Sequence, residues 1–273
     1  MINRKVGFIG GGNMARAIAG GLLRGGMHAT DVFIAEPRIE QCELLRDELY
    51  GTMVTDDNAT VARAAEALVF AVKPQILEAV CTDLEPVISE SRPLIISIAA
   101  GPRIAGIDRW LGGDNSIVRV MPNQPALIDQ GISALIANDR ASAADRELAE
   151  SIMSAVGQYV WVGSESDIDA VTAVSGTGPA YFYLLIDVMI RAGERYGLDA
   201  DTARALAVET ARGATALASA ESESMTRMIE RVRSPGGTTT AAFEHLDAAD
   251  VRGIFADAIE AARLRAIELG GAD

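Results

Sequence analysis

The N-terminal glycine motif is the feature that most constrains the fold of this chain. The apolar run Val6–Ile9 leads directly into Gly10-Gly11-Gly12, and a helix-forming stretch begins at Met14. In this G-x-G-x-x-A spacing the first glycine permits a tight turn, and the second lets the backbone approach a pyrophosphate. Ala15 is small enough to lie where helix meets strand. The motif predicts a dinucleotide-binding unit with phosphates at the helix N-terminus.

Apolar runs and helical patterns alternate over residues 1–163, as in a doubly wound parallel sheet with helices on both faces. The predicted strands are Val6–Gly10, Val32–Glu36, Ala67–Val72, Leu94–Ile98 and Ser116–Val120, with weaker ones at Gly131–Ile136 and Gln158–Val162. Amphipathic stretches between them include Met14–Arg24, Ile39–Leu49 and Pro74–Val87. We therefore expect an α/β fold with an N-terminal Rossmann-type domain at 1–163.

The remaining residues, 164–273, lack strand-like runs and are rich in Ala, Leu, Glu and Arg. The predicted helices are Pro179–Tyr196, Asp201–Ala220, Ser224–Val232, Thr239–Leu246 and Val251–Leu269. Their apolar faces hold many alanines, so each helix has only a thin core of its own. Such a set commonly completes its core against a second copy. We expect an all-α domain that forms a homodimer.

Composition narrows the possible partners and location. The net charge of −14 and a pI near 4.6 argue against nucleic acid or an anionic membrane surface as partner. Cys42, Cys81, His28 and His245 show no metal-ligand spacing, so no metal site is expected. No signal peptide is visible, and the apolar stretch Ala180–Ile190 is interrupted by Asp187 and too short to span a bilayer. The expected location is the cytoplasm.

Two residues at the end of the second predicted strand and just beyond it bear on the choice of coenzyme. Glu36 lies 21 residues beyond Ala15, where a carboxylate would accept hydrogen bonds from the adenosine ribose and favour NADH. Arg38 would instead bind the 2′-phosphate of NADPH. Glu36 is alternatively no more than a solvated charge at a strand end. The sequence leaves NADH and NADPH both open.

Later segments place further residues at the carboxyl edge of the sheet, where open α/β sheets bind ligands. Lys73-Pro74 follows one strand, and two more strands lead into Ala99-Ala100-Gly101 and Met121-Pro122-Asn123. Asn58 begins a helix and is either its N-cap or a coenzyme contact. The predicted coenzyme contacts are Ile9, Gly10, Gly11, Gly12, Asn13, Met14, Glu36, Arg38, Asn58, Ala71, Val72, Lys73, Pro74, Ala99, Ala100 and Gly101.

A second candidate anion site lies near the C-terminus, in Ser234-Pro235-Gly236-Gly237-Thr238-Thr239. The proline fixes one φ angle and the glycines free the next two, so the run predicts a tight turn that opens a helix. A helix N-terminus offers unpaired N–H groups to a carboxylate or phosphate. The alternative is an ordinary capped surface helix. Two anion sites suggest a coenzyme brought face to face with a small acidic substrate.

Over essentially its whole length the chain resembles the pyrroline-5-carboxylate reductases. The resemblance rests on several motifs in order: Phe8–Ala15, Ala71-Val72-Lys73-Pro74-Gln75, Arg119–Asn123, Asp169–Tyr181 and Ser234–Thr239. It implies a Rossmann-type domain, a helical domain whose helices interleave with those of a partner chain, and dimers that often assemble into decamers. It also implies hydride transfer from NADH or NADPH to 1-pyrroline-5-carboxylate, giving L-proline.

The resemblance also assigns roles to the C-terminal turn. Ser234, Gly237 and Thr238 would hold the substrate carboxylate, and Thr239 would hydrogen-bond the ring nitrogen, with the turn contributed by the partner subunit. A cyclic imine is partly protonated near neutral pH and accepts hydride readily. Positioning would therefore matter more than acid–base groups. Thr239 is the candidate catalytic residue; its alternative role is a first-turn helix threonine.

The chain departs from the family pattern at three positions, and rival functions remain. Gln124 stands where a threonine is usual, and Arg231 and Arg233 replace smaller or polar residues, so they could add charge near the carboxylate pocket or the coenzyme. The rivals are a related imine or hydroxyacid reductase and a non-catalytic dinucleotide-binding module. Hydroxyacid dehydrogenases of this build need a lysine on the first long C-terminal helix, and Pro179–Tyr196 contains none.

Overall fold

The structure, a computed structural model, describes residues 4–271. The chain forms two compact units, which are described separately below. The first contains Met1–Gly176 together with Ala262–Asp273, and the second contains Thr177–Ala261. The division at 163/164, drawn from the change in sequence character, remains a prediction.

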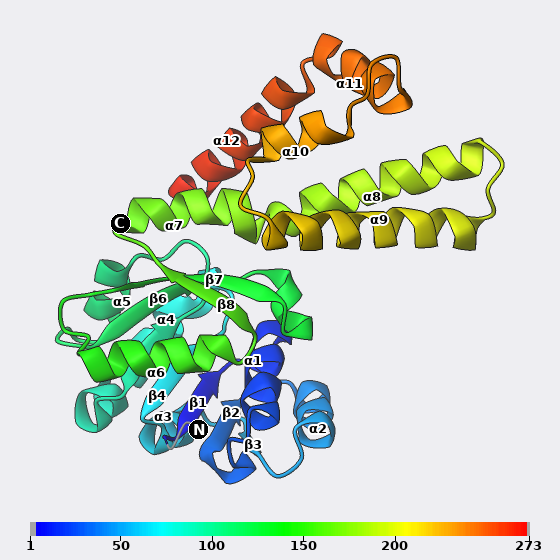
Figure 1. Cartoon of the computed structure of the whole chain (residues 1–273). Helices are drawn as coiled ribbons and strands as arrows, with labels where there is room; N and C mark the ends of the chain where they lie inside the picture. The colour runs from blue at the N-terminus through cyan, green and yellow to red at the C-terminus, as the bar shows by residue number, and fades with distance from the viewer. Residues whose placement is uncertain (1–3, 272–273) are drawn as a thin grey trace. The chain divides into compact units, whose positions relative to one another are not determined.

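An eight-stranded sheet forms the centre of the first unit, with strand order β3-β2-β1-β4-β5-β6-β7-β8 (Figure 1). All neighbouring pairs are parallel except β6 and β7. The strands are β1 (Val6–Ile9), β2 (Val32–Ala35), β3 (Met53–Thr55), β4 (Ala67–Phe70), β5 (Leu94–Ser97), β6 (Ile117–Met121), β7 (Gly131–Ala137) and β8 (Gly157–Trp161). The seven predicted strands are confirmed. The short edge strand β3 was missed because it is partly exposed and lacks an apolar run.

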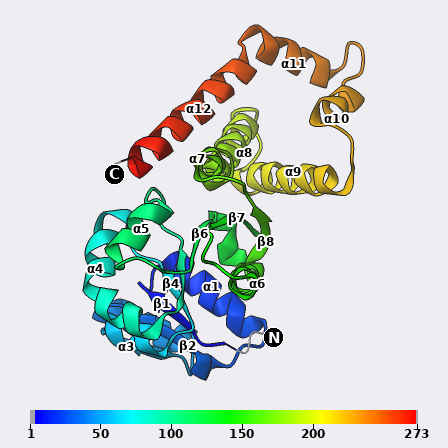
Figure 2. The ribbon, with the colours of Figure 1, turned by 90° about the vertical axis from the view of Figure 1, so that its left-hand side faces the viewer.

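Helices cover both faces of this sheet, as Figure 2 shows. They are α1 (Asn13–Arg24), α2 (Ile39–Glu48), α3 (Asn58–Ala64), α4 (Pro74–Ser91), α5 (Ile104–Trp110) and α6 (Ala143–Ser154), with short 3-10 turns at Ala29–Asp31 and Gln124–Ile128. Alternate residues of a strand enter different cores. In β4, Val69 packs with residues of α1 and α6, whereas Leu68 and Phe70 pack with residues of α3, α4 and α5. Burial on both faces explains the continuous apolar runs.

Local signals explain where these helices begin and end. Pro74 occupies the first turn of α4, where its missing N–H costs nothing. The helix continues past the predicted end at Val87 and stops at Ser91, since Arg92 takes a left-handed conformation with φ 48°. The N-cap of α3 is Asp57, whose side chain accepts a hydrogen bond from the Ala59 N–H. The interpretation of Asn58 as the N-cap is therefore wrong.

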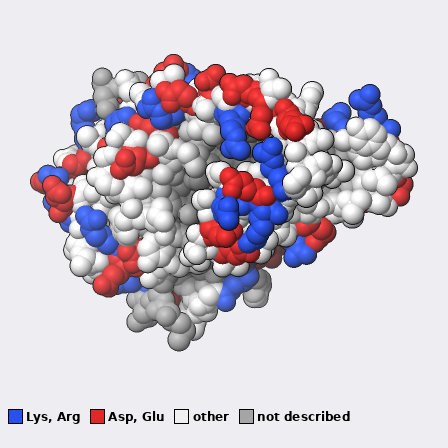
Figure 3. Space-filling model, turned by 45° about the horizontal axis from the view of Figure 1, so that its top comes forward, with Lys and Arg blue, Asp and Glu red and all other residues white. Residues whose placement is uncertain are grey.

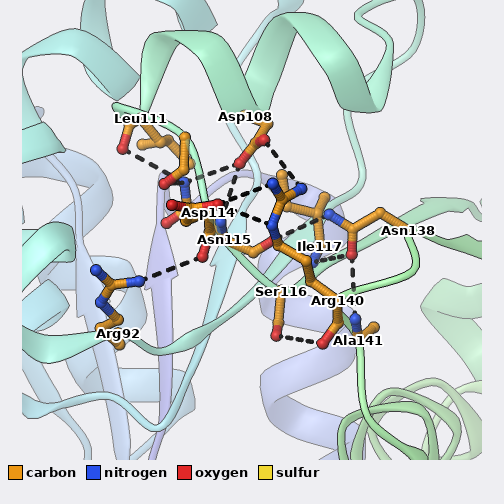
Figure 4. Close-up of polar contacts among 11 residues, drawn as sticks. Arg92, Asp108, Leu111, Asp114, Asn115, Ser116, Ile117, Asn138, Arg140 and Ala141 are labelled. Atoms are coloured by element: carbon orange, nitrogen blue, oxygen red, sulfur yellow. Dashed lines mark hydrogen bonds and ion pairs between the residues drawn. The ribbon is translucent and has the colours of Figure 1, made fainter.

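A polar network braces the amino-terminal end of β6 (Figure 4). Asp108 accepts hydrogen bonds from the backbone and side chain of Asn115, each at 3.0 Å. Arg140 forms ion pairs with Asp108 at 3.6 Å and with Asp114 at 2.8 Å. This network lies at the edge of β6 opposite the carboxyl ends of the parallel strands, so it stabilises the fold away from the predicted site.

The remaining elements are helical. They are α7 (Glu165–Val171), a π-helical turn (Thr172–Gly176), α8 (Gly178–Arg195), α9 (Ala200–Ala220), α10 (Met225–Val232), α11 (Thr238–Ala248) and α12 (Val251–Gly270). The five predicted C-terminal helices are confirmed, and α7 was not predicted. Within Thr177–Ala261 only Gly178, Ala203 and Ala207 are buried. The large apolar side chains of α8 are exposed, among them Phe182, Tyr183, Leu184, Leu185, Val188 and Met189.

One helical run, Glu165–Arg195, is long and apolar enough by length and composition to cross a membrane. The sequence expectation concerned Ala180–Ile190 alone, and the helical run is longer because it includes the residues on both sides of that stretch. Only 11% of its apolar window is buried within this chain. A helix whose apolar face packs against another subunit passes the same test.

Candidate functional site

The predicted coenzyme residues of the first unit lie together at the carboxyl edge of the sheet. The ladder extends one residue past each strand: the Gly10 N–H donates to Ala35 at 2.8 Å, and the Ala71 N–H donates to Ile9 at 2.9 Å. The Ile98 N–H donates to Phe70 at 3.2 Å. These bonds fix the loops that follow β1, β4 and β5 side by side, as expected for a ligand-binding crevice.

The glycine loop has the geometry that phosphate binding requires. Gly10 has φ +97°, and a Cβ there would lie 2.9 Å from the Ala71 carbonyl oxygen, so only glycine fits. Gly12 is the N-cap of α1 and, as a glycine, supplies no side-chain cap. A Cβ on Gly12 would meet nothing within 4 Å. Open space at a helix N-terminus, next to exposed Asn13, suits a phosphate group. The residues present therefore fit a dinucleotide.

Glu36 is a buried anchor for this loop. Its carboxylate accepts a hydrogen bond from the Gly11 N–H at 3.0 Å. It also accepts bonds from the Arg38 backbone at 3.1 Å and from Nε and Nη2 of Arg38 at 2.8 and 3.1 Å. Only 3% of Glu36 is exposed, so the alternative of a solvated strand-end charge is wrong.

The pKa of Glu36 reflects the same contacts. Burial raises the pKa, but the hydrogen bonds from the Arg38 side chain, the Arg38 backbone and the Gly11 N–H together outweigh burial and hold the pKa below its ordinary value. Arg38 itself remains 66% exposed beside the carboxylate. A buried anion and an exposed cation therefore share this corner of the site.

Gln41, on α2, binds the glycine loop and was missed by sequence reasoning. Its side-chain amide donates to the Gly11 carbonyl at 2.7 Å, so Glu36 binds the backbone N–H of Gly11 and Gln41 binds the backbone carbonyl of the same residue. The only sequence signal for this contact is that Gln41 lies in the first turn of α2, close to the end of β2. No short motif contains it.

The other predicted coenzyme residues border the same edge. Ala71 and Val72 are half-buried, Lys73 is exposed, and Pro74 opens α4. Asn58, also half-buried, is the first residue of α3. In the next loop Ala99 and Gly101 are buried, and Gly101 has φ +103°.

The C-terminal turn belongs to the second unit and has the predicted form. The Gly237 N–H donates to the Ser234 carbonyl at 2.9 Å, closing a turn in which Gly236 has φ +70°. Thr240 Oγ1 donates to the same carbonyl at 2.6 Å. Gly237 is the N-cap of α11 and supplies no side-chain cap, and Thr238 and Thr239 follow in the first turn. Their amides therefore face outward at a helix N-terminus.

Two of the departures from the family pattern are engaged within the second unit. Arg231 pairs with Glu221 at 2.7 Å and with Glu223 at 3.2 Å. Arg233 lies over the ring of Phe243 at 5.2 Å and 3.8 Å from Asp247. Both arginines have acidic partners, which offset the charge that they could offer a ligand. Figure 3 likewise shows basic and acidic side chains interspersed on the face drawn.

The structure thus brings together the predicted coenzyme residues of the first unit. Ser234, Gly237, Thr238 and Thr239 form their own turn in the second unit. Among residues 4–271 no group of three His, Cys, Asp or Glu side chains could hold a metal ion.

Two family models match the chain. One, described as pyrroline-5-carboxylate reductase dimerisation, covers residues 165–269. The other, described as NADP oxidoreductase coenzyme F420-dependent, covers residues 5–101. The second range holds the glycine loop and the Glu36–Arg38 pair, and the first holds α7 to α12.

Known proteins match over nearly the full length. The pyrroline-5-carboxylate reductase of Pseudomonas aeruginosa is 42% identical over 269 residues, 98% of each chain, and that of Pisum sativum is 34% identical over 264 residues. A solved pyrroline-5-carboxylate reductase from Coxiella burnetii superposes with TM-score 0.91 at 38% identity, covering 98% of this chain and 99% of that one. The Plasmodium falciparum enzyme, solved with NADP bound, gives TM-score 0.89 at 29% identity and covers 99% of each chain.

Fold and site together define an oxidoreductase with a Rossmann-type coenzyme domain and a helical dimerisation domain. The identity and coverage of its relatives make the assignment narrower. The chain belongs to the pyrroline-5-carboxylate reductase family.

Proposed function

We propose that this protein reduces 1-pyrroline-5-carboxylate to L-proline with hydride from NADPH, the last step of proline biosynthesis. The observation that carries the proposal is the open, uncapped N-terminus of α1 at Gly12, flanked by the loops after β2, β4 and β5 at one edge of the sheet. A family relative with 42% identity over 98% of its length supports the reaction.

Binding of the coenzyme is assigned to the first unit. Gly10 to Met14 would hold the pyrophosphate of the coenzyme, with Ile9 beneath it. Ala71 to Pro74 and Asn58 would border the middle of the coenzyme. Ala99, Ala100 and Gly101 would face the nicotinamide. When bound, the coenzyme supplies the hydride; the chain's own residues bind and orient it.

The Glu36–Arg38 pair favours NADPH over NADH. A carboxylate offers about four acceptor positions, and Glu36 already accepts four N–H donors. A ribose diol would have to displace Arg38 to reach it. A 2′-phosphate instead meets the exposed guanidinium of Arg38, which keeps its bonds to Glu36.

Binding of the substrate is assigned to the turn before α11. The amide of Thr238 at the start of α11 and the hydroxyl of Ser234 would donate hydrogen bonds to the substrate carboxylate, and Gly237, without a side chain, would let the carboxylate approach the backbone. Thr239 would hydrogen-bond the ring nitrogen and steady its proton. The carboxylate is then held by dipoles rather than by a cation, which suits a chain of net charge −14.

The assembly we propose is a homodimer with interleaved C-terminal helices, in which the partner subunit contributes the turn, and which assembles further into a decamer. The exposed apolar face of α8 supports the dimer, because such surface is stable only when covered. Substrate and coenzyme are both water-soluble anions, which favours work in the cytoplasm. We propose neither nucleic acid nor membrane as a partner.

The test is NAD(P)H oxidation, followed at 340 nm with and without 1-pyrroline-5-carboxylate. We expect substrate-dependent oxidation, with higher kcat/KM for NADPH than for NADH, and L-proline as product. If NAD(P)H oxidation requires a different imine or the keto acid of a hydroxyacid, the protein is a related reductase with another substrate. If the coenzyme binds but is not oxidised, the protein is a non-catalytic binding module.

A further inference from the structure

A buried arginine lies within the sheet of the first unit. Arg119 is on β6 and only 2% of its side chain is exposed, which makes it the largest fully buried side chain among residues 4–271. Its neighbours on the strand, Val118 and Val120, face the opposite core. A buried cation is costly unless it is paired and hydrogen-bonded, and an apolar side chain fills such a position at lower cost.

Arg119 holds the loop between β5 and α5. Nη2 of Arg119 donates to the Gly101 carbonyl at 3.1 Å. Nη1 donates to Glu165 Oε1 at 2.8 Å, and the same oxygen accepts the Ile104 N–H at 3.0 Å. One ion pair thus fixes a carbonyl within the loop and the amide just after it. The loop carries Ala99, Ala100 and Gly101, which are assigned to the nicotinamide.

A second ion pair ties the same loop to the same helix. Arg103, the N-cap of α5, donates to Asp169 at 3.0 Å, and the Asp169 side chain is 3% exposed. Glu165 and Asp169 are four residues apart, so both lie on one face of α7. Two arginines from the Rossmann fold therefore meet two carboxylates of the helix that begins the C-terminal region.

The C-terminal end of α12 also packs against this loop, next to Gly101. A Cβ on Gly101 would lie 2.8 Å from the Leu269 carbonyl, and a Cβ on Gly270 would lie 2.9 Å from the Gly101 carbonyl. In Figure 2 this end of α12 lies beside α5. The Gly101 carbonyl that Arg119 holds is thus enclosed, and the loop can shift only if these contacts shift with it.

The hydrogen bonding of Arg119 is incomplete, which argues against a purely stabilising role. Arg119 Nε is buried without a hydrogen-bond partner, and so is Ser97 Oγ. Ser97 is the register partner of Arg119 on β5 and the last residue before the loop. Unpaired buried polar atoms oppose folding, so this pair of residues costs stability at the base of the loop.

We propose that Arg119 is a positioning residue for hydride transfer: with Glu165 it fixes the loop at Ala99 to Gly101 against the nicotinamide and couples that loop to α7. This inference rests on the proposed function. Arg119 acts through the Gly101 carbonyl rather than by contact with substrate. Its loss should impair alignment of the reacting carbons more than binding of the adenine half of the coenzyme.

The test compares R119M, which removes the charge and both hydrogen bonds, with R119K, which keeps the charge. For R119M we expect kcat to fall about 10- to 100-fold while the dissociation constant of NADPH changes less than about threefold. The primary isotope effect with 4-deuterated NADPH should rise, because the chemical step becomes slower than release. R119K should recover part of kcat.

R140M is the matched control, because Arg140 braces the opposite end of β6 through Asp108 and Asp114. It should lower Tm and leave kcat and the isotope effect unchanged. If R119M leaves kcat and the isotope effect unchanged, or if kcat falls only in proportion to the number of coenzyme-binding sites, as partial unfolding would cause, the inference is wrong.

A readout without substrate separates this inference from the proposed function. Hydrogen exchange at residues 98–104 should be faster in R119M than in the wild type, and the fluorescence of bound NADPH should change. If the wild type fails to reduce 1-pyrroline-5-carboxylate but both changes occur, the proposed function is wrong and the positioning of the loop by Arg119 is supported. If exchange and fluorescence are unchanged, loop positioning falls whatever the activity.

Discussion

The two units of this chain reach stability in different ways. In the first, strands buried on both faces make two continuous cores between the sheet and its helices. In the second, Thr177–Ala261, the described helices bury only three residues, all glycine or alanine, and leave large apolar side chains exposed. The first unit has a core of its own, whereas the second is complete only with a partner.

This difference separates two tasks. Coenzyme binding is assigned to a unit whose loops are held by its own strands, and so it should not depend on protein concentration. Substrate binding is assigned to a turn of the unit that needs a second copy. Activity should therefore depend on concentration even where coenzyme binding does not.

The largest effect should come from placing charge on the exposed face of α8. In Val188→Glu, a symmetric dimer would bury the new carboxylate twice, at about 3–5 kcal/mol each. The dimer dissociation constant should rise at least about 10⁴-fold, and activity should be lost while NADPH still binds. Sedimentation velocity and NADPH fluorescence measure both. Tyr50→Glu, at a side chain 89% exposed on the first unit, is the control and should remain an active dimer.

A smaller effect is expected at the turn of the second unit. Thr239→Val keeps the shape of the side chain and removes its hydroxyl, so kcat should fall about 100-fold with NADPH affinity unchanged. Thr239→Ser, which retains the hydroxyl, should recover most of kcat. Steady-state kinetics and coenzyme titration measure this, and equal kcat in the valine variant would remove Thr239 from the mechanism.

Substitutions in the glycine loop of the first unit should instead change NADPH affinity or thermal stability. Gly12→Ala adds a methyl group to space that is open in the free protein, so Tm should hold while NADPH affinity falls about tenfold. Gly10→Ala forces alanine to φ +97° against the Ala71 carbonyl, so Tm itself should fall. Thermal unfolding and NADPH titration distinguish the two. A lower Tm in Gly12→Ala would contradict the assignment.

The smallest expected effect is a pH dependence of stability, which comes from Glu36 and is confined to the first unit. Because the pKa of this carboxyl is lowered in the folded protein, its stabilisation is complete above the ordinary value of about 4.3 and is lost as pH falls through the folded value. Glu36→Gln should cost about 1–2 kcal/mol of unfolding free energy at pH 7. Urea unfolding should show that this difference shrinks below pH 4.3; a constant difference would contradict it.

Periodicity and glycine spacing predicted most of the fold. Strands buried on both faces, such as β1 and β4, read as apolar runs, and Pro74 and Gly237 mark helix starts locally. The edge strand β3 has no such run. The cap at Asp57 rather than Asn58 was equally hidden, since both residue types cap helices.

The site was only partly predictable for a different reason. The glycines and the turn at Ser234 are local motifs, so their positions follow from neighbouring residues. The contacts of Arg119 with Glu165 and Gly101 join segments 46 and 18 residues apart. The saturation of Glu36 by Arg38 and Gly11 depends on side-chain direction and burial. Such long-range pairings leave no periodic trace in one sequence.

Both ends of the second unit return to the first, because α12 carries the chain back to residues 262–271. Topologically, Thr177–Ala261 is an insertion. A protease that cuts the bend between α8 and α9, near Gly197, would leave two fragments, each of which still contains part of the first unit. We expect the two fragments of the cleaved protein to stay associated. We also expect that another helical segment could replace residues 177–261 without unfolding the first unit.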